Sequence, residues 1–191
     1  MAPKIILTGF MATGKSAVAR ALARRLGWRN VDCDAEIVAR AGKSIPEIFR
    51  DSGEPHFRTL EREVIASIAD SRRQCPQCGH PMPAIVATGG GAIVDMRNVE
   101  VLRRAGVIVC LTARPEVIAR RLGRSVKSRP MLTQGNKPLK ARIAELMEAR
   151  REAYSRADIT IDTSRLSVDE VVEAIIDAVA ARRCEGWRLS A

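Results

Sequence analysis

Gly9-Phe10-Met11-Ala12-Thr13-Gly14-Lys15-Ser16 is the stretch that decides the fold of this chain. It follows the apolar run Ile5-Ile6-Leu7 and precedes a run rich in Ala and Arg, which is the pattern of a buried strand, a glycine loop and a helix. Its spacing, G-x-x-x-x-G-K-[ST], is that of a phosphate-binding P-loop. Glycines let backbone N–H groups approach a polyphosphate closely, and the helix N-terminus adds a favourable dipole.

Two residues of this loop carry specific expectations. Lys15 is expected to reach the β- and γ-phosphates of a nucleotide, and the Ser16 hydroxyl to coordinate Mg²⁺. The alternative is a plain turn between a strand and a helix. Because the motif lies between a predicted strand and a predicted helix, the phosphate-binding interpretation is favoured.

Composition limits the class of protein. A chain of 191 residues with 46% hydrophobic content indicates one domain with a single sizeable core. Aromatic residues make up only 3%, so Ala, Val, Ile and Leu build the core, which suits parallel strands covered by helices. The net charge is +10, yet aromatics are too sparse for base stacking. We therefore expect small anionic substrates and no nucleic acid partner.

Nothing in the sequence indicates a membrane or an export signal. No stretch approaches the length of a membrane span, and Met1-Ala2-Pro3-Lys4 leads directly into the first predicted strand. The five cysteines are scattered apart from one close pair, which is typical of reduced thiols. We expect a cytoplasmic monomer.

Apolar runs alternate with helical patterns along the chain, which predicts an α/β fold: a five-stranded parallel sheet with helices on both faces, in three layers. The predicted strands are Lys4–Thr8, Asn30–Asp32, Ala84–Ala87, Val107–Leu111 and Asp158–Ile161. The predicted helices are Lys15–Leu26, Glu36–Ala41, Ile45–Phe49, Phe57–Ala69, Met96–Ala105, Pro115–Leu122, Leu139–Tyr154 and Val168–Ala181. Residues 71–83 and 124–137 lack periodicity and are predicted to be functional or mobile loops.

Carboxylates follow the second predicted strand. Asp32 and Asp34 alternate at its carboxyl end, where open α/β sheets bind their ligands. This spacing predicts one carboxylate for Mg²⁺ and one for an acceptor hydroxyl. The alternative is that Asp34 only caps the following helix, although capping and function can coexist.

Two later stretches are candidates for ligand contacts, one through charged side chains and one through glycine backbone. Arg58 and Glu61 lie one helical turn apart, and such a charged pair is on its own most often a solvated surface pair. Gly89-Gly90-Gly91 ends a predicted strand and offers N–H groups that no side chain shields. A floppy turn is the alternative, but a turn rarely needs three glycines.

The ordered set of motifs resembles the shikimate kinase family along nearly the whole chain. It comprises the P-loop, Asp32-Cys33-Asp34, Ser44-Ile45-Pro46-Glu47-Ile48-Phe49, the stretch from Gly53 to Glu61, and Gly89-Gly90-Gly91-Ala92. Arg129-Pro130-Met131-Leu132 is similar to the family's lid, and Arg150 with Tyr154 to its Arg-x-x-x-Tyr element. Each motif is moderately specific, whereas the ordered set is highly specific.

The resemblance implies a reaction. It implies transfer of the γ-phosphoryl of ATP to the 3-hydroxyl of shikimate, within chorismate and aromatic amino acid biosynthesis, with Mg²⁺ as the cofactor. On the acceptor side, Arg58 would clamp the shikimate carboxylate, with Arg150 as a second cation. Asp34 would bind ring hydroxyls and accept the proton, and the backbone of Gly89, Gly90 and Gly91 would contact shikimate.

On the donor side, the resemblance implies that Ser16 binds Mg²⁺ directly and Asp32 through water. Arg129 would close onto the transferring phosphoryl and exclude water. The implied catalytic residues are Lys15, Asp34 and Arg129. The implied ATP-binding residues are Gly9, Met11, Ala12, Thr13, Gly14, Lys15, Ser16, Ala17, Arg121, Arg129 and Arg165, with Arg121 and Arg165 near adenine.

The implied organisation is one kinase domain over residues 1–191, with a substrate-binding segment at about 34–62, a Cys-containing insertion at about 71–83 and a lid at about 124–137. The sequence departs from the family in two places. Ala149-Arg150-Arg151-Glu152-Ala153-Tyr154 lacks the family's usual proline, so Arg150 or Arg151 could be the shikimate ligand, and the spacing to Tyr154 favours Arg150.

The second departure is the insertion. Cys75-Pro76-Gln77-Cys78-Gly79-His80 looks like half of a zinc ribbon, with Cys75, Cys78 and His80 as candidate Zn²⁺ ligands. Structural zinc needs four ligands, and Cys184, or a second copy of the chain, would have to complete the set. A loop with two reduced thiols is the favoured interpretation.

Two rival classes of nucleotide-binding protein fit the motifs less well. A regulatory GTPase would need an Asn-Lys-x-Asp motif, but Asn136-Lys137 continues with Pro-Leu. A gluconate-type kinase shares the P-loop and lid but has no reason to carry Arg58, Asp34 and the three glycines together.

Overall fold

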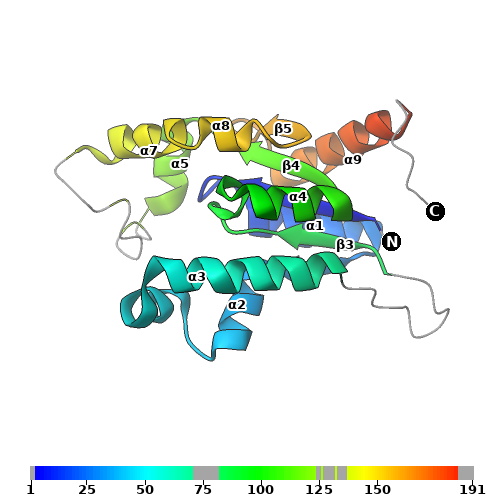
Figure 1. Ribbon diagram of the computed structural model, residues 1–191. Helices are drawn as coiled ribbons and strands as arrows, with labels where there is room; N and C mark the ends of the chain where they lie inside the picture. Colours follow the sequence, from blue (N-terminus) through cyan, green and yellow to red (C-terminus); the bar gives the residue numbers. More distant parts are fainter. Residues whose placement is uncertain (1–2, 71–81, 124–125, 127–131, 133–136, 185–191) are drawn as a thin grey trace.

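The computed structural model describes residues 3–70, 82–123, 126, 132 and 137–184 (Figure 1). Five strands form one parallel sheet in the order β2-β3-β1-β4-β5. The strands are β1 (Lys4–Gly9), β2 (Arg29–Asp32), β3 (Ala84–Ala87), β4 (Gly106–Thr112) and β5 (Ile159–Asp162). The predicted α/β fold is confirmed.

Helices cover both faces of this sheet. The described helices are α1 (Lys15–Leu26), α2 (Cys33–Ala41), α3 (Ile45–Asp70), α4 (Met96–Ala105), α5 (Pro115–Leu122), α7 (Leu139–Glu148), α8 (Arg151–Tyr154) and α9 (Val168–Cys184), with a 3₁₀ turn η1 (Ala92–Val94). None of the described helices is long and apolar enough to cross a membrane.

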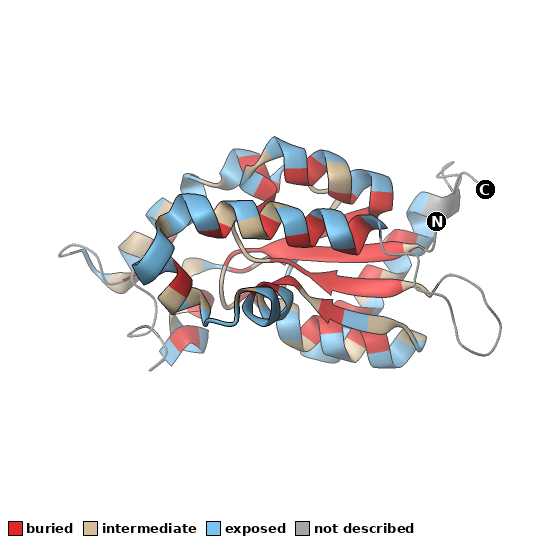
Figure 2. Cartoon of the chain, turned by 60° about the horizontal axis from the view of Figure 1, so that its bottom comes forward, coloured by how far each residue is buried: buried red, intermediate tan, exposed pale blue. Residues whose placement is uncertain are grey.

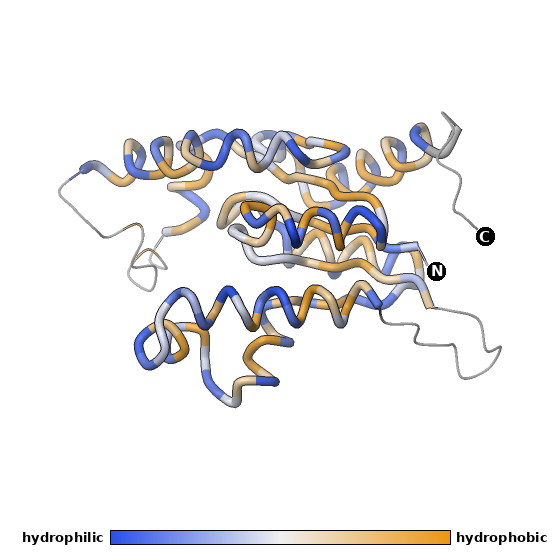
Figure 3. The backbone as a smooth tube through the Cα atoms, viewed as in Figure 1, coloured by the Kyte–Doolittle hydropathy of each residue, from blue (hydrophilic) through white to orange (hydrophobic). Residues whose placement is uncertain are grey.

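The core lies in two layers because alternate residues of each strand point to opposite faces. Ile5 and Leu7 of β1 pack with residues of α1 and α9, whereas Ile6 packs with residues of α3, α4 and α5. The three middle strands β1, β3 and β4 are buried almost throughout, whereas the edge strands β2 and β5 are not (Figure 2). In Figure 3, α3 alternates between hydrophilic and hydrophobic residues, as a helix with one buried face does.

The predicted separation of Ile45–Phe49 from Phe57–Ala69 agrees with a kink within α3, where Gly53 has a non-helical backbone (φ 75°, ψ 174°). One predicted helix is wrong. The predicted helix Leu139–Tyr154 is instead two helices, because α7 ends at Glu148 and Arg150 leaves the helical region (φ −111°, ψ 4°). Helical periodicity continues through this second break, so the pattern alone did not reveal it.

The strand order brings three loops together. β1 lies between β3 and β4, and β3 lies between β1 and β2. In parallel strands the carboxyl ends share one edge, so the loops after Gly9, Asp32 and Ala87 meet there. The functional residues predicted for these loops are therefore neighbours in space.

Candidate active site

The P-loop is held in a backbone shape that its glycines make available. Gly9 has φ 128°, and a Cβ built on it would lie 2.1 Å from the Leu111 carbonyl oxygen of β4. No side chain fits there. Gly14 also has positive φ (99°), as does Ala12 (59°). The loop therefore curls back over the carboxyl end of β1 and directs its backbone toward the start of α1.

Side chains of the loop stabilise this shape from inside. The Lys15 ammonium donates to the carbonyl oxygens of Gly9 and Phe10, each at 2.8 Å. The Thr13 hydroxyl donates to the Phe10 carbonyl, also at 2.8 Å. Lys15 thus lies across the mouth of the loop, where its charge faces any anion bound by the backbone N–H groups.

The loop after β5 supports the P-loop from outside. The Thr163 hydroxyl lies 3.1 Å from the Thr13 carbonyl and 3.0 Å from the Thr112 carbonyl. Arg121, near the end of α5, donates to the Thr163 hydroxyl (2.9 Å) and to the Thr163 carbonyl (2.6 Å). Arg165, two residues further on, is exposed. Sequence reasoning missed Thr163, although its place directly after a strand was a usable signal.

Asp32 has a second task besides the one predicted for it. Its Oδ1 accepts hydrogen bonds from the backbone N–H groups of Asp34 (3.0 Å) and Ala35 (3.4 Å), so Asp32 is the N-cap of α2. The alternative that Asp34 caps this helix is therefore wrong, because α2 begins one residue earlier, at Cys33. Asp34 lies in the first turn, half-buried.

The other carboxylate oxygen of Asp32 faces the P-loop. Asp32 Oδ2 lies 3.5 Å from the Ser16 hydroxyl oxygen. A hydroxyl and a carboxylate are hard oxygen donors, which Mg²⁺ prefers, and Mg²⁺ usually keeps several waters besides one or two protein ligands. The donor set at Ser16 and Asp32 therefore fits Mg²⁺.

A cavity of about 310 Å³ joins these groups to the third loop. Its walls come from the P-loop, the start of α2 and the glycine turn after β3. The lining residues are Met11, Ala12, Gly14, Lys15, Ser16, Ala17, Asp32, Asp34, Ala87, Thr88, Gly89 and Gly90. The cavity thus holds both the predicted phosphate-binding residues and Asp34.

The three glycines let charged side chains crowd against the backbone. A Cβ on Gly89 would lie 3.1 Å from Asp34 Oδ1 and 3.2 Å from Glu61 Oε1. A Cβ on Gly91 would lie 2.8 Å from both terminal nitrogens of Arg58. The glycine turn therefore lies beside Asp34, Glu61 and Arg58.

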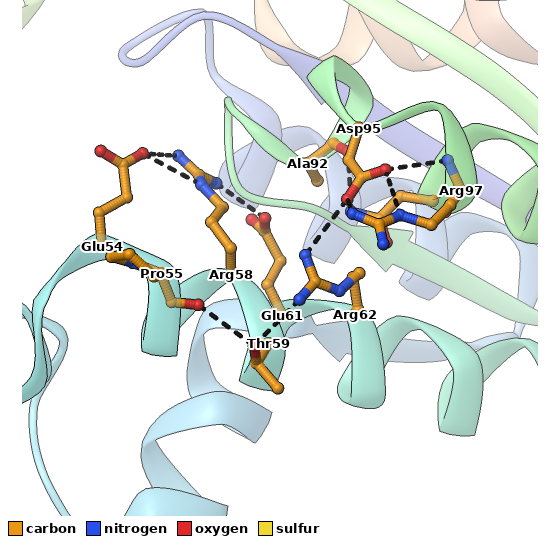
Figure 4. Close-up of polar contacts among 10 residues, drawn as sticks. Glu54, Pro55, Arg58, Thr59, Glu61, Arg62, Ala92, Asp95 and Arg97 are labelled. Carbon is orange, nitrogen blue, oxygen red and sulfur yellow. Dashed lines mark hydrogen bonds and ion pairs between the residues drawn. The ribbon is translucent and has the colours of Figure 1, made fainter.

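Arg58 is anchored by two carboxylates (Figure 4). One terminal nitrogen lies 2.7 Å from Glu61 Oε2, and the other lies 3.0 Å from Glu54 Oε1. The Glu61 side chain is only 2% exposed, so the interpretation as a solvated surface pair is wrong. Burial raises the pKa of Glu61 even though Arg58 opposes that shift. Burial works to lower the pKa of Arg58, but the attraction of Glu61 and Glu54 raises it overall, so Arg58 stays charged.

Arg150 and Arg151 point to different places. Arg150 lies 3.4 Å from the Gly90 carbonyl oxygen and 6.0 Å from the centre of the Phe10 ring. Arg151 is 79% exposed and pairs with Glu148 at 3.0 Å. The break between α7 and α8 produces this difference. Arg150, which the spacing to Tyr154 favoured, is the one beside the glycine turn.

Some predicted residues lie outside the described residues: Arg129 of the predicted lid, and Cys75, Cys78 and His80 of the insertion. Within the described part of the chain, no group of three or more His, Cys, Asp or Glu side chains could hold a metal ion.

Comparison with known proteins identifies the family of this site. The family model of shikimate kinase matches residues 11–180. The chain belongs to the shikimate kinase family. A shikimate kinase of Geobacter sulfurreducens is 49% identical over 171 residues, which are 90% of this chain and 87% of that protein. A shikimate kinase of Geobacter metallireducens is 45% identical over 93% of this chain and 92% of its own length.

A solved shikimate kinase shares the fold. The shikimate kinase from Acinetobacter baumannii in complex with shikimate is 31% identical, has a TM-score of 0.82, and each chain is covered to 96%. The P-loop, the strand order and the glycine turn described above are therefore features of a shikimate kinase family member.

Proposed function

We propose that this chain transfers the γ-phosphoryl of ATP to the 3-hydroxyl of shikimate and releases shikimate 3-phosphate and ADP, a step of aromatic amino acid biosynthesis. One observation carries the proposal. Within a member of the shikimate kinase family, the P-loop, Asp34 and the glycine turn line one crevice, and Arg58 lies beside that turn. Positioning and charge stabilisation supply most of the catalysis in phosphoryl transfer, and this crevice offers both.

On the donor side, the P-loop backbone and Lys15 would hold the β- and γ-phosphates. Lys15 reaches the mouth of the loop, which supports this assignment. Ser16 and Asp32 would hold Mg²⁺, which supplies positive charge against the phosphate oxygens when bound. Asp32 can do this while capping α2, because its two oxygens face different partners.

On the acceptor side, Arg58 would clamp the shikimate carboxylate. Its guanidinium is charged, part-buried and held in place by Glu54 and Glu61, so little side-chain entropy is lost on binding. Arg150 would add a second cation from the opposite side of the glycine turn. Backbone N–H groups of Gly89, Gly90 and Gly91 would donate to the acceptor.

Asp34 would accept the proton of the attacking hydroxyl. It lines the same cavity as Lys15 and Ser16, and its carboxylate also borders the glycine turn. It is therefore the carboxylate in this cavity that can contact an acceptor facing the donor phosphate. Asp32 already accepts hydrogen bonds at the start of α2 and lies beside the Ser16 hydroxyl.

Three further assignments rest on the resemblance of motifs. Arg129 would neutralise charge on the transferring phosphoryl as the lid at 124–137 closes, and Arg121 and Arg165 would border adenine. The contacts of Arg121 with Thr163 put it beside the P-loop, which supports a nucleotide role. A zinc site at Cys75, Cys78 and His80 is not part of the proposal.

We also propose one kinase domain over residues 1–191, acting as a cytoplasmic monomer. A sedimentation measurement at assay concentration tests the oligomeric state.

The test is a coupled assay of ADP release with pure shikimate, ATP and Mg²⁺. We expect turnover with shikimate, none with gluconate, and loss of turnover in Asp34→Asn. A matched control is Asp51→Asn, an exposed carboxylate paired with Lys43 and Arg50 away from the crevice. No turnover with shikimate, or equal turnover with gluconate, would contradict the proposal.

A further inference from the structure

One hydrogen bond to the glycine turn has no role in the site described so far. The Tyr154 hydroxyl of α8 donates to the Gly90 carbonyl oxygen at 2.9 Å, and Arg150 lies 3.4 Å from the same oxygen. A carbonyl oxygen has two lone pairs and can accept from both groups. The Gly90 carbonyl is therefore held toward α8.

Holding that carbonyl also fixes the next N–H group. The peptide unit is planar and trans, so the Gly91 N–H points opposite to the Gly90 carbonyl and away from α8. Arg58 lies beside this peptide, because its guanidinium is within 2.8 Å of a Cβ built on Gly91. The orientation of the peptide between Gly90 and Gly91 therefore sets the direction of a donor that lies next to the proposed acceptor site. Glycines would otherwise leave this peptide free to rotate.

The segment after α8 is tied to η1 and α4. Arg156, two residues past the end of α8, donates to the carbonyl of Val94 in η1 at 3.2 Å, and Arg103 of α4 donates to the carbonyl of Arg156 at 2.8 Å. Tyr154 itself is 9% exposed. Its ring packs in the core layer that includes Phe10 and Ile93. The hydroxyl is therefore presented by a packed ring, and the chain just beyond it is hydrogen-bonded to two neighbouring elements.

We propose that Tyr154 is a positioning residue for the acceptor site, fixing the Gly90–Gly91 peptide so that its N–H is ready for the bound acceptor. This inference rests on the proposed function, because the acceptor is taken to be shikimate. Preorganised donors strengthen binding by lowering its ordering cost. The role is separate from that of Arg150, which brings charge, because Tyr154 is neutral and acts only through the peptide.

The first test is Tyr154→Phe, which keeps the ring and removes the donor. We expect the KM and the directly measured Kd for shikimate to rise about 5- to 15-fold, as for loss of one hydrogen bond. The KM for ATP and kcat are expected to stay within about 2-fold, since the P-loop is not touched. Ser155→Ala is the matched control, because it removes a neighbouring hydroxyl that bonds only to the Glu152 carbonyl. Ser155→Ala should change neither the KM nor the Kd for shikimate.

A second test uses the fact that Tyr154 is the only tyrosine of the chain. Growth with 3-fluorotyrosine places one fluorine on this ring without any substitution. We expect the fluorine NMR signal to shift when shikimate is added and to stay in place when ADP is added. A residue that only packs would not distinguish the two ligands.

The outcomes are separable. If wild-type protein turns over shikimate while Tyr154→Phe binds shikimate normally, the inference is overturned and the proposed function stands. The inference is also overturned if Tyr154→Phe weakens the binding of shikimate and ATP equally, or if the fluorine NMR signal does not shift when shikimate is added. If the wild type does not turn over shikimate, the proposed function itself has failed.

Discussion

The guanidinium of Arg58 lies 2.7 Å from the carboxylate of Glu61, and the Glu61 side chain is 2% exposed. The negative member of this ion pair is buried, whereas Arg58 keeps 27% exposure and lies beside the glycine turn. Removing one partner of such a pair leaves an uncompensated buried charge, at a cost of about 3–5 kcal/mol. The pair therefore links the stability of α3 to the acceptor site.

Replacing Arg58 by Ala should weaken shikimate far more than ATP. Loss of one or two charged hydrogen bonds at about 1.5–3 kcal/mol each predicts a rise in the shikimate KM of at least ~10-fold. The KM for ATP should change less than about 3-fold. Steady-state kinetics with each substrate varied provide the measurement.

The control for this prediction is Arg62→Ala, one turn further along α3. Arg62 pairs with Asp95 rather than facing the glycine turn. Equal losses for both substrates in Arg58→Ala, or an equal loss in Arg62→Ala, would rule out a carboxylate clamp at Arg58.

Glu61 should make stability depend on pH. Burial raises its pKa, so the folded protein keeps this proton at pH values where the unfolded chain has lost it. The free energy of unfolding contributed by Glu61 is therefore highest below its ordinary pKa of 4.5 and falls as pH rises toward the raised value. Glu61→Gln should remove this fall, as measured by urea unfolding from pH 4 upward.

The exposed Glu47 gives the opposite sign as a contrast. Hydrogen bonds from Ser44 lower its pKa, so its contribution is present above 4.5 and is lost as pH falls. If Glu61→Gln and Glu47→Gln change the pH dependence in the same direction, the assignment for Glu61 is wrong.

Asp32→Asn should separate the two tasks of Asp32. Asn caps a helix about as well as Asp, so the free energy of unfolding should fall by no more than ~0.5 kcal/mol. The Mg²⁺ concentration for half-maximal turnover should rise about 10-fold, since an anionic oxygen near Ser16 is lost. Asp32→Ala should show both defects. If Asp32→Asn needs the same Mg²⁺ concentration for half-maximal turnover as the wild type, Asp32 is not a Mg²⁺ ligand.

Thr163→Val should weaken ATP selectively. It keeps the shape of the side chain but removes the hydroxyl that lies between Arg121 and the Thr13 carbonyl. We expect the KM for ATP to rise ~5-fold or more, at about 1 kcal/mol per lost hydrogen bond, with little change for shikimate. Thr160→Val, at an exposed position of β5, is the control. If Thr163→Val and Thr160→Val have the same KM for ATP, Thr163 does not support ATP binding by the P-loop.

Two thiols should resist modification in the folded protein. Cys33 and Cys110 are free and buried, and burial raises the pKa of Cys110 to about 11 and raises that of Cys33 as well. Because the thiolate is the reactive form, alkylation at pH 8 should be slow until urea unfolds the chain. Peptide mass mapping after iodoacetamide treatment measures this. Rapid labelling of either residue in native protein would contradict the burial described here.

Much of the fold could be predicted because its signals are local. The apolar runs at Ala84–Ala87 and Val107–Leu111, and the helical periods of Met96–Ala105 and Pro115–Leu122, match the observed elements to within a residue. The kink at Gly53 falls between two helices that were predicted separately. The helix break at Arg150 was missed, since helical periodicity runs through it.

The sequence by itself determined the P-loop, the residue types of the acceptor site and the family, because each is written in short spacings. Only the tertiary structure decided that Glu61 is buried, that Arg150 rather than Arg151 meets the glycine turn, and that Tyr154 bonds to Gly90. The physical reason is separation along the chain. Tyr154 and Gly90 are 64 residues apart, and Thr163 and Thr13 are 150 apart. Such contacts exist only once the sheet has placed their elements side by side.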